Sequence, residues 1–376
     1  MTQHHVTADI DLGRLSRNVE TLKRKINGPA LMAIVKANAY GHGLVQSAQA
    51  AKRGGADWLA TALIEEAIDL RNAGVSGPIL TWLNTLDDRF EECISKDIDL
   101  GINSLESLFA ISAAAGKVGK AARVQVKIDT GLGRNGVTLE DLPNLISALK
   151  QARSSGQVKV VGVFSHFAYA DEPSNPTIGE QINNFKIAVD ALTDANFELE
   201  VKHLSNSAAT LGLPHTYNNL VRPGLAIYGI SPSPEVGEAT EHDLKPVMRL
   251  RAPIILIKDV PAGTGVSYAH QYHTKTQTKL ALIPAGYADG IPRAASNKGP
   301  LLIDGKRFTI SGRVCMDQFV VDIGDANVKP GDQAVLFGDP ANGEPSVNDW
   351  AEAAGTINYE IVTRIGQRVF RNYLNG

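Results

Sequence analysis

The sequence predicts an α/β fold, a (β/α)8 TIM barrel followed by a mostly β C-terminal domain. Three observations predict it. Eight apolar runs of strand-like composition occur before about Pro232, and helical patterns separate most of them. Polar residues gather where these runs end, and after Pro232 short strands follow one another without helices. Buried strands that alternate with helices favour a parallel sheet. A doubly wound open sheet is the competing arrangement.

The eight predicted strands cover the runs Leu31–Lys36, Trp58–Leu63, Pro78–Leu83, Ile98–Ile102, Arg123–Asp129, Val158–His166, Leu199–Leu204 and Leu220–Tyr228. Helical patterns lie at Gly43–Ala51, Ile64–Asn72, Leu105–Ala115, Leu139–Arg153 and Thr177–Ala195. In such a barrel, catalytic groups collect at the carboxyl ends of the strands. The polar residues near these ends are Lys36, Lys127, Asp129, His166, Ser205, Ser207 and Arg222.

The second part of the chain begins after a link, Ser231–Asp243, that is rich in Pro and Glu. Turn signals separate short predicted strands at Val247–Val260, Lys279–Ala285, Pro300–Ile303, Phe308–Ile310, Phe319–Ile323 and Gln333–Phe337. Strands in a row without helices indicate a separate, mostly β domain. We therefore expect a barrel domain over residues 1–235 and a β domain over residues 236–376.

Composition excludes several classes of protein. The net charge is −3 and no basic run stands out, so nucleic acid and anionic membranes have no electrostatic support as partners. No apolar stretch approaches the roughly 20 residues that a membrane span needs. Two cysteines allow one disulfide at most, and the polar N-terminus has no secretory pattern, so we expect a cytoplasmic protein. The sequence predicts no metal site.

Lys36 ends the first apolar run and stands just before Tyr40, Gly41, His42 and Gly43. A lysine beside an apolar wall has a lowered pKa, because burial disfavours its charged form. Its neutral amine can attack a carbonyl and form a Schiff base. The alternative is a lysine that merely ends the strand and extends to water. These residues alone leave both interpretations open.

The stretch Gly131–Gly136 has the G-x-G-x-x-G spacing of dinucleotide-binding loops. Such a site also needs an acidic residue about 20 positions further on. The chain has Arg153-Ser154-Ser155-Gly156 there, and the next strand ends in His166. The pattern therefore favours a glycine-rich loop that presents Arg134 to a small anion, since arginine suits bidentate carboxylate binding.

Two stretches after the seventh and eighth strands, Ser205–Ser207 and Pro223–Leu225, offer backbone N–H groups where barrels often bind phosphate. Helix capping is the alternative use of the serines. Arg222 lies in an apolar run and stays charged, so it needs a partner. Either a structural ion pair or His166 can supply that partner.

In the second domain, Gly263–Tyr268 places a tyrosine after a flexible glycine turn. Phenols ionise near pH 10, so a tyrosine acts as a base only beside cations. An exposed loop tyrosine is the other interpretation. Cys315 has no histidine near it in the sequence, and we expect a small buried residue rather than a nucleophile.

With these residues in hand, the chain resembles the alanine racemase family, barrel enzymes that use pyridoxal 5′-phosphate (PLP). The resemblance covers nearly the whole chain. Its motifs are Val35–Gly43, Lys127–Arg134, His166–Ala168, Asn206–Ala208, Arg222–Gly229, Gly265–Tyr268 and Cys315–Asp317.

The resemblance implies a role for each motif. Lys36 holds PLP as a Schiff base and acts as one catalytic base, and Tyr268 is the base on the opposite face. The residues implied to bind the cofactor are Lys36, Tyr40, His166, Asn206, Ser207, Arg222, Gly224, Leu225 and Tyr359. Arg134, Met316 and Asp317 are implied to bind the substrate, and Lys127 corresponds to a lysine that is carbamylated in relatives.

The implied activity is the interconversion of L-alanine and D-alanine, which supplies D-alanine for peptidoglycan. Family members are homodimers in which one subunit lends Tyr268, Met316 and Asp317 to the site of the other. Three alternative functions remain. The first is a barrel-type PLP decarboxylase, although in those enzymes the residue facing the pyridine nitrogen is acidic, whereas this chain has Arg222. The others are a single-barrel PLP-binding protein without a β domain and an NAD-dependent dehydrogenase. Serine is the competing substrate.

Overall fold

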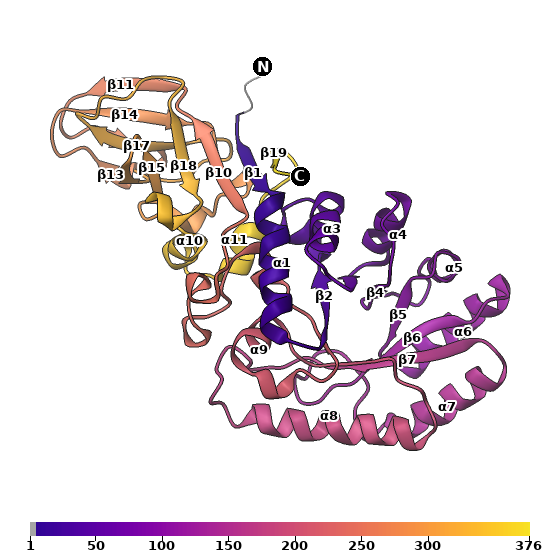
Figure 1. The fold of residues 1–376 in the computed structure, drawn as a ribbon. Helices are drawn as coiled ribbons and strands as arrows, with labels where there is room; N and C mark the ends of the chain where they lie inside the picture. The colour runs from indigo at the N-terminus through magenta and orange to yellow at the C-terminus, as the bar shows by residue number, and fades with distance from the viewer. Residues whose placement is uncertain (1–4) are drawn as a thin grey trace. The chain divides into compact units, whose positions relative to one another are not determined.

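The computed structural model describes residues 5–376 of the chain, and residues 1–4 of the polar N-terminal segment lie outside them. The chain forms two compact units (Figure 1). One, here called the barrel unit, comprises residues 15–39 and 44–244. The other, here called the β unit, comprises the segment up to Arg14, residues 40–43 and residues 245–376. The predicted domain boundary at residue 235 stays a prediction. The sequence did not predict that the segment up to Arg14 and residues 40–43 belong to the β unit.

The barrel unit contains eight parallel strands in the order β8-β7-β6-β5-β4-β3-β2-β9, which confirms the predicted α/β barrel. The strands are β2 (Ala30–Ile34), β3 (Trp58–Thr61), β4 (Ile79–Thr81), β5 (Asp99–Ile102), β6 (Ala122–Lys127), β7 (Val158–Phe164), β8 (Val201–His203) and β9 (Leu220–Val221). Their apolar side chains are buried almost without interruption, because both faces of the sheet are covered.

Helices connect the strands and cover their outer face; Figure 1 shows α6, α7 and α8 there. The helices of this unit are α1 (Leu12–Ile26), which begins in the β unit, α3 (Leu44–Arg53), α4 (Ile64–Asn72), α5 (Phe90–Ser95), α6 (Leu105–Val118), α7 (Leu142–Ser154), α8 (Thr177–Asp194) and α9 (Ser207–Gly212). Local signals set their ends. In α6, Ser104 and Ser107 form a capping box, and Gly119 ends the helix with a φ of 70°.

The eighth strand is shorter than the predicted run Leu220–Tyr228. β9 ends at Val221, and the 3₁₀ helix η2 (Leu225–Tyr228) takes up the rest of the run. Pro223 has no N–H group to continue the ladder, which explains the early end. Arg222 therefore follows the strand, and its backbone N–H donates to the carbonyl of Ser205, 2.8 Å away, beside the seam between β8 and β9.

The β unit contains a six-stranded sheet in the order β16-β15-β18-β10-β1-β19 and a three-stranded sheet in the order β11-β14-β17. Its strands are β1 (Thr7–Asp11), β10 (Met248–Pro253), β11 (Leu256–Val260), β14 (Thr278–Ile283), β15 (Pro300–Ile303), β16 (Lys306–Thr309), β17 (Phe319–Gly324), β18 (Gln333–Phe337) and β19 (Phe370–Leu374), with a hairpin of β12 (Gly265–Val266) and β13 (Tyr272–His273). β1 was not predicted as a strand. It pairs antiparallel with β10 and parallel with β19.

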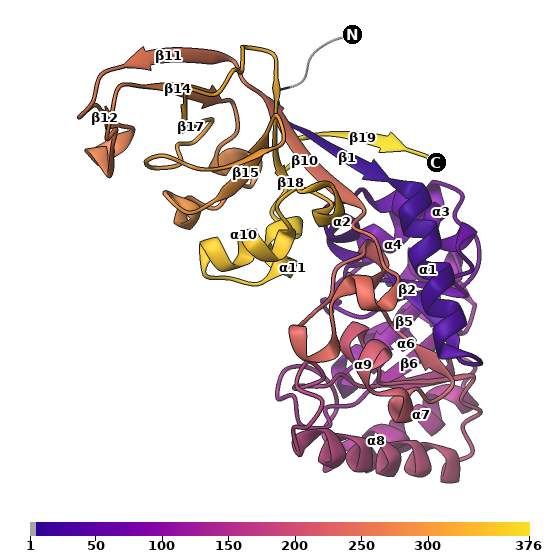
Figure 2. The ribbon, with the colours of Figure 1, turned by 60° about the vertical axis from the view of Figure 1, so that its left-hand side comes forward.

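Two helices pack side by side in the β unit, α10 (Val347–Ala354) and α11 (Asn358–Thr363) (Figure 2). Ser346 caps α10, and the indole of Trp350 donates to the carbonyl of Leu336 at 2.6 Å, which fastens the helix to β18. Within residues 5–376, none of the helices combines the length and the apolar character that crossing a membrane requires.

Candidate active site

Lys36 lies two residues beyond the end of β2, at the carboxyl end of the barrel strands. It is half-buried, and its Nζ lies 5.9 Å from the centroid of the Trp82 ring. Burial lowers the pKa of Lys36, and Arg134 and Arg222 lower it further, while Glu66 opposes them. The amine therefore loses its proton more readily than an ordinary lysine, which favours nucleophilic chemistry.

A left-handed turn follows Lys36. Ala37, Asn38, Ala39 and Tyr40 have φ angles between 52° and 54°, a region that costs a non-glycine residue about 1–2 kcal/mol. Two hydrogen bonds hold the turn: the N–H of Asn38 donates to Glu66, and its side-chain oxygen accepts from the N–H of Leu44, each at 2.9 Å. Such strain persists only where the surroundings enforce it, and it is common at functional sites.

Tyr40 ends this turn and belongs to the β unit. It is buried, and its ring centroid lies 6.1 Å from that of Tyr359 on α11. Burial raises the pKa of Tyr40, so its hydroxyl keeps its proton and can donate a hydrogen bond. The next residue must be glycine, because a Cβ on Gly41 would lie 2.3 Å from the carbonyl oxygen of Val362.

Four cations define the electrostatics of the barrel unit near Lys36. They are Lys36, Lys127, Arg134 and Arg222; the two arginines lower the pKa of both lysines, and Lys36 lowers that of Lys127 as well. Burial lowers the pKa of Lys127 to about 8, with further contributions from Arg134 and Arg222, and Asp129 opposes them. Among residues 5–376, none of the four forms an ion pair with a carboxylate. This excess of positive charge suits an anionic ligand.

The loop that carries Arg134 is shaped by one carboxylate. Oδ1 of Asp129 accepts hydrogen bonds from the backbone N–H groups of Gly131, Leu132 and Gly133 at 3.0, 3.0 and 3.1 Å. Burial would raise the pKa of Asp129, but these backbone donors outweigh it and the pKa is lowered. A Cβ on Gly136 would lie 2.5 Å from the backbone nitrogen of Asp129, so the loop closes tightly. Arg134 stands exposed on it.

Arg222 is only 5% exposed, and the predicted His166 is one of its partners, although not the nearest one. It donates to Nδ1 of His203 at 2.9 Å and to the carbonyl of Ser165 at 2.6 Å. Contacts with Nδ1 of His166, at 3.4 Å, and with the carbonyl of Leu204, at 3.3 Å, are longer. No carboxylate in the described part of the chain pairs with it, so the structural ion pair is absent. The Nε–H of Arg222 is not the donor in any of these four contacts.

Ser207 joins the loop after β8 to the loop after β9. Its Oγ accepts from the backbone N–H of Gly224 at 2.8 Å and from that of Ala226 at 3.3 Å. Asn206 caps α9, and its side chain accepts from the N–H of Ala209 at 3.0 Å. The structure thus brings together Ser207, Gly224 and the buried Leu225, and it uses Asn206 as a helix cap.

In the β unit, the side chains of Tyr268 and Met316 are 69% and 54% exposed, and Asp317 is exposed as well. Ser267, with a φ of 60°, precedes the tyrosine and donates its hydroxyl to the carbonyl of Arg313 at 2.7 Å. This bond ties the loop of Tyr268 to the loop of Met316 and Asp317. Asp317 also pairs with Arg368 at 2.8 Å.

Sequence reasoning missed several residues of this region. Trp82 directly follows β4, so the end-of-strand rule that selected Lys36 also points to it. His203 ends β8 and satisfies the same rule. Glu66 lies in the first turn of α4, and Phe164 reads as an ordinary core residue, so neither carried a signal.

The sequence matches the family "Alanine racemase, N-terminal domain" over residues 10–232 and the family "Alanine racemase, C-terminal domain" over residues 247–373. The chain belongs to the alanine racemase family. The resemblance inferred from the motifs is therefore confirmed.

Individual alanine racemases are similar to this chain over nearly its whole length. That of Salinispora arenicola is 51% identical over 365 residues, which cover 97% of this chain and 97% of that protein. That of Frankia casuarinae is 49% identical over 367 residues, covering 98% of this chain and 96% of that protein. The crystal structure of the Streptomyces lavendulae alanine racemase has 51% identity and a TM-score of 0.99, covering 100% of this chain and 98% of that chain.

A more distant alanine racemase, that of Bacillus anthracis with bound L-Ala-P, has a TM-score of 0.89 at 33% identity, covering 100% of this chain and 96% of that chain. The racemase fold is thus retained in this chain from end to end, and the chain is an enzyme of the alanine racemase family.

Proposed function

We propose that this chain interconverts L-alanine and D-alanine with PLP as cofactor and with Lys36 and Tyr268 as the two bases. One observation carries the proposal: on a racemase fold, a half-buried lysine with a lowered pKa stands at the carboxyl end of β2, near cations that form no ion pair with a carboxylate within residues 5–376. That arrangement suits an aldehyde cofactor with an anionic phosphate, because the amine can bond to the aldehyde and the cations offset the phosphate charge.

The residues present fit such a cofactor. Lys36 would hold it covalently, and Arg222, whose Nε–H is not the donor in the four contacts above, would face the ring nitrogen. The residues that would surround it are Tyr40, His166, Asn206, Ser207, Gly224, Leu225 and Tyr359. When bound, PLP draws electrons away from the Cα of the amino acid and acidifies its α-proton.

The chain's own groups then bind the substrate and move the proton. Arg134 would hold the carboxylate of alanine bidentately, and Met316 and Asp317 would line the substrate. One base removes the proton from one face of Cα, and the other returns a proton to the opposite face. Lys127 would stand beside Arg134 as a carbamate, an anion that steadies the guanidinium.

Arg222 would control which reaction occurs. Burial lowers its pKa to about 9, so it remains a cation at neutral pH. A fixed cation beside the pyridine nitrogen disfavours protonation of that nitrogen. The weaker withdrawal of electrons that results would limit transamination and decarboxylation.

We further propose that the chain acts as a cytoplasmic homodimer that supplies D-alanine for peptidoglycan. The family resemblance implies all three points. The exposure of Tyr268 and Met316 agrees with side chains that complete a neighbouring subunit's site.

The test is to follow the circular-dichroism signal of L-alanine with purified protein that has been supplied with PLP. We expect the signal to decay to zero, with the near-visible absorbance of a lysine-linked cofactor. The variant Lys36→Ala should lose both that absorbance and the decay, because no other amine replaces Nζ. Wild-type protein that carries PLP and leaves both L-alanine and L-serine unchanged would rule out the racemase and leave a carrier. Parallel assays with serine decide the substrate.

A further inference from the structure

A line of buried hydrogen bonds begins at Arg222 and runs through the barrel unit to Asp99. Arg222 donates to Nδ1 of His203 at 2.9 Å, and Nε2 of His203 lies 2.7 Å from Oε1 of Gln125. Nε2 of Gln125 donates to Oδ2 of Asp99 at 3.0 Å. Gln125 and His203 are fully buried, and Asp99 is 1% exposed, so water does not substitute for any of these partners.

The residues at the two ends of this line fix the direction in which every hydrogen bond along it is donated. A guanidinium only donates, and an ionised carboxylate only accepts. Nδ1 of His203 must therefore be unprotonated toward Arg222, and its proton lies on Nε2, where it is donated to Gln125. The amide of Gln125 in turn has its oxygen toward His203 and its NH2 toward Asp99. Reversing any member would set donor against donor within the core.

Packing keeps His203 in the plane that this line requires. Its ring stacks on Phe164, with centroids 5.0 Å apart and an interplanar angle of 3°. The Arg222 guanidinium carbon lies 5.7 Å from the centroid of the same Phe164 ring. Burial holds the pKa of His203 well below its usual value, and Arg222 adds to this effect, so the imidazole is neutral.

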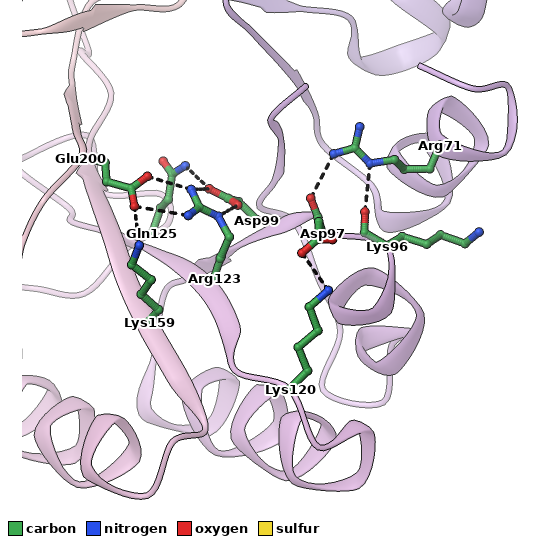
Figure 3. A network of polar contacts seen from close by, with 9 residues as sticks. All are labelled: Arg71, Lys96, Asp97, Asp99, Lys120, Arg123, Gln125, Lys159 and Glu200. Atoms are coloured by element: carbon green, nitrogen blue, oxygen red, sulfur yellow. Dashed lines mark hydrogen bonds and ion pairs between the residues drawn. The ribbon is translucent and has the colours of Figure 1, made fainter. Parts of the chain in front are cut away.

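The far end of the line is fixed by ion pairs near the start of the strands (Figure 3). Arg123 on β6 donates to Asp99 at 2.8 Å and to Glu200 at 2.9 Å. Lys159 on β7 pairs with Glu200 at 2.7 Å. Burial raises the pKa of Asp99, but the hydrogen bonds from Arg123 and Gln125 favour its carboxylate form. The line thus ends on a carboxylate held by an arginine.

We propose that Gln125 and Asp99 are positioning residues: they keep the proton of His203 on Nε2 and thereby hold the Arg222 guanidinium in place. The consequence for reaction choice rests on the proposed function, in which Arg222 faces the ring nitrogen of the cofactor. The arrangement of protons does not rest on it. Asp99, which begins β5 at the opposite end of the barrel strands from Lys36, would thus act through Gln125 and His203 on Arg222.

The experiment reads the protons of His203 directly. The protein is labelled with ¹⁵N-histidine, and the His203 signals are assigned by difference from a His203→Asn variant. In the wild type we expect a protonated Nε2 and an unprotonated Nδ1. A protonated Nδ1 in the wild type overturns the proposal whether or not the protein racemises alanine, so this result is separate from the test of the activity.

Variants extend the test along the line. Gln125→Met keeps the volume and removes the acceptor, so we expect a second tautomer and a rise on the order of tenfold in pyruvate released per D-alanine formed, because a buried hydrogen-bond partner is lost. Asp99→Leu should act in the same direction, whereas Asp99→Asn keeps an oxygen that accepts from Gln125 and should keep the tautomer.

The matched control is Lys120→Ala, which removes a surface ion pair with Asp97 at the same end of the barrel unit and touches no member of the line. It should leave both the His203 signals and the pyruvate ratio as in the wild type. The proposal fails if folded Gln125→Met protein shows the wild-type tautomer and the wild-type pyruvate ratio. It also fails if Asp99→Leu and Asp99→Asn behave alike. The wild-type spectrum decides the matter even if these variants do not fold.

Discussion

At the scale of single residues, Lys127 shows how burial in a barrel core lowers the pKa of a side chain. The residue is 7% exposed, and three cations surround it. Burial and these cations lower its pKa from 10.5 to about 8. Its ammonium form is therefore costly, and a reaction that removes the positive charge relieves that cost.

Carbamylation is such a reaction, and it has a defined pH dependence. The neutral amine attacks CO2, forms an N–C bond and releases one proton. Because the pKa is about 8, the neutral fraction increases steeply between pH 7 and pH 9. At constant dissolved ¹³CO2, we expect a carbamate carbon signal that increases over this range in the NMR spectrum. The signal should be missing in Lys127→Met, and a signal that survives this change would assign it to another amine.

At the scale of elements, the loop between β6 and α7 depends on a single side chain, Asp129. The loop has no regular structure of its own over Gly131–Gly133, and its three N–H groups converge on Oδ1. Glycines supply the positive φ angles of 130° at Gly131 and 69° at Gly133 that this convergence needs. The loop is thus a rigid support for Arg134 rather than a flexible connection.

Two substitutions at Asp129 separate its geometry from its charge. Asp129→Ala removes the acceptor, so we expect a loss on the order of 1–3 kcal/mol in the free energy of unfolding. The KM for alanine should increase roughly tenfold, since Arg134 is no longer held. Asp129→Asn keeps an oxygen that accepts N–H groups and should recover most of both values. Urea unfolding and polarimetric kinetics measure them. Equal losses in the two variants would mean that the negative charge, and not the acceptor, supports the loop.

At the scale of the whole molecule, the two proposed bases belong to different units: Lys36 to the barrel unit and Tyr268 to the β unit. If subunits share their sites, a dimer of Lys36→Ala and Tyr268→Ala chains contains one site that has lost both bases and one that has both. Random mixing gives heterodimers as half of all dimers, so about a quarter of the wild-type sites should return.

The measurement is the racemase activity of the two variants unfolded together, mixed and refolded. Each variant refolded alone serves as the control and should be inactive. If both bases of a site came from the same chain, every site in the mixture would still lack one of them. The mixture would then be as inactive as its components.

Much of the barrel unit could be predicted from local pattern. Each apolar run predicts a strand buried on two faces, and α4 has the predicted bounds Ile64–Asn72. The end-of-strand rule selected Lys36 and Lys127 correctly as residues at the carboxyl ends of β2 and β6. The eighth strand was predicted to be longer than it is. The apolar residues continue past Pro223 into η2, whereas the strand hydrogen bonds end with β9 at Val221.

Of the histidines that contact Arg222, His166 was anticipated from the sequence, but His203 and the Gln125 beyond it could not be predicted in this way. His203 lies 19 residues before Arg222, and Gln125 lies 78 residues before His203. Neither residue stands out in the sequence, because a histidine and a glutamine in apolar strands are usual. Their contact arises from the curvature of the sheet, which brings the side chains of β5, β6 and β8 into one core.

Composition and periodicity were thus enough to establish the class of the fold, the approximate positions of the eight barrel strands and the placement of Lys36 and Lys127 at their carboxyl ends, because burial and backbone geometry act over a few neighbouring residues. The tertiary structure was needed to establish which residues contact each other. Examples are the pairing of β1 with β10 and β19, the hydrogen bonds of Asp129 to its loop, and the hydrogen bond from Arg222 to His203. These contacts join residues that are distant along the chain, and their energies depend on directions and distances that a linear sequence does not contain.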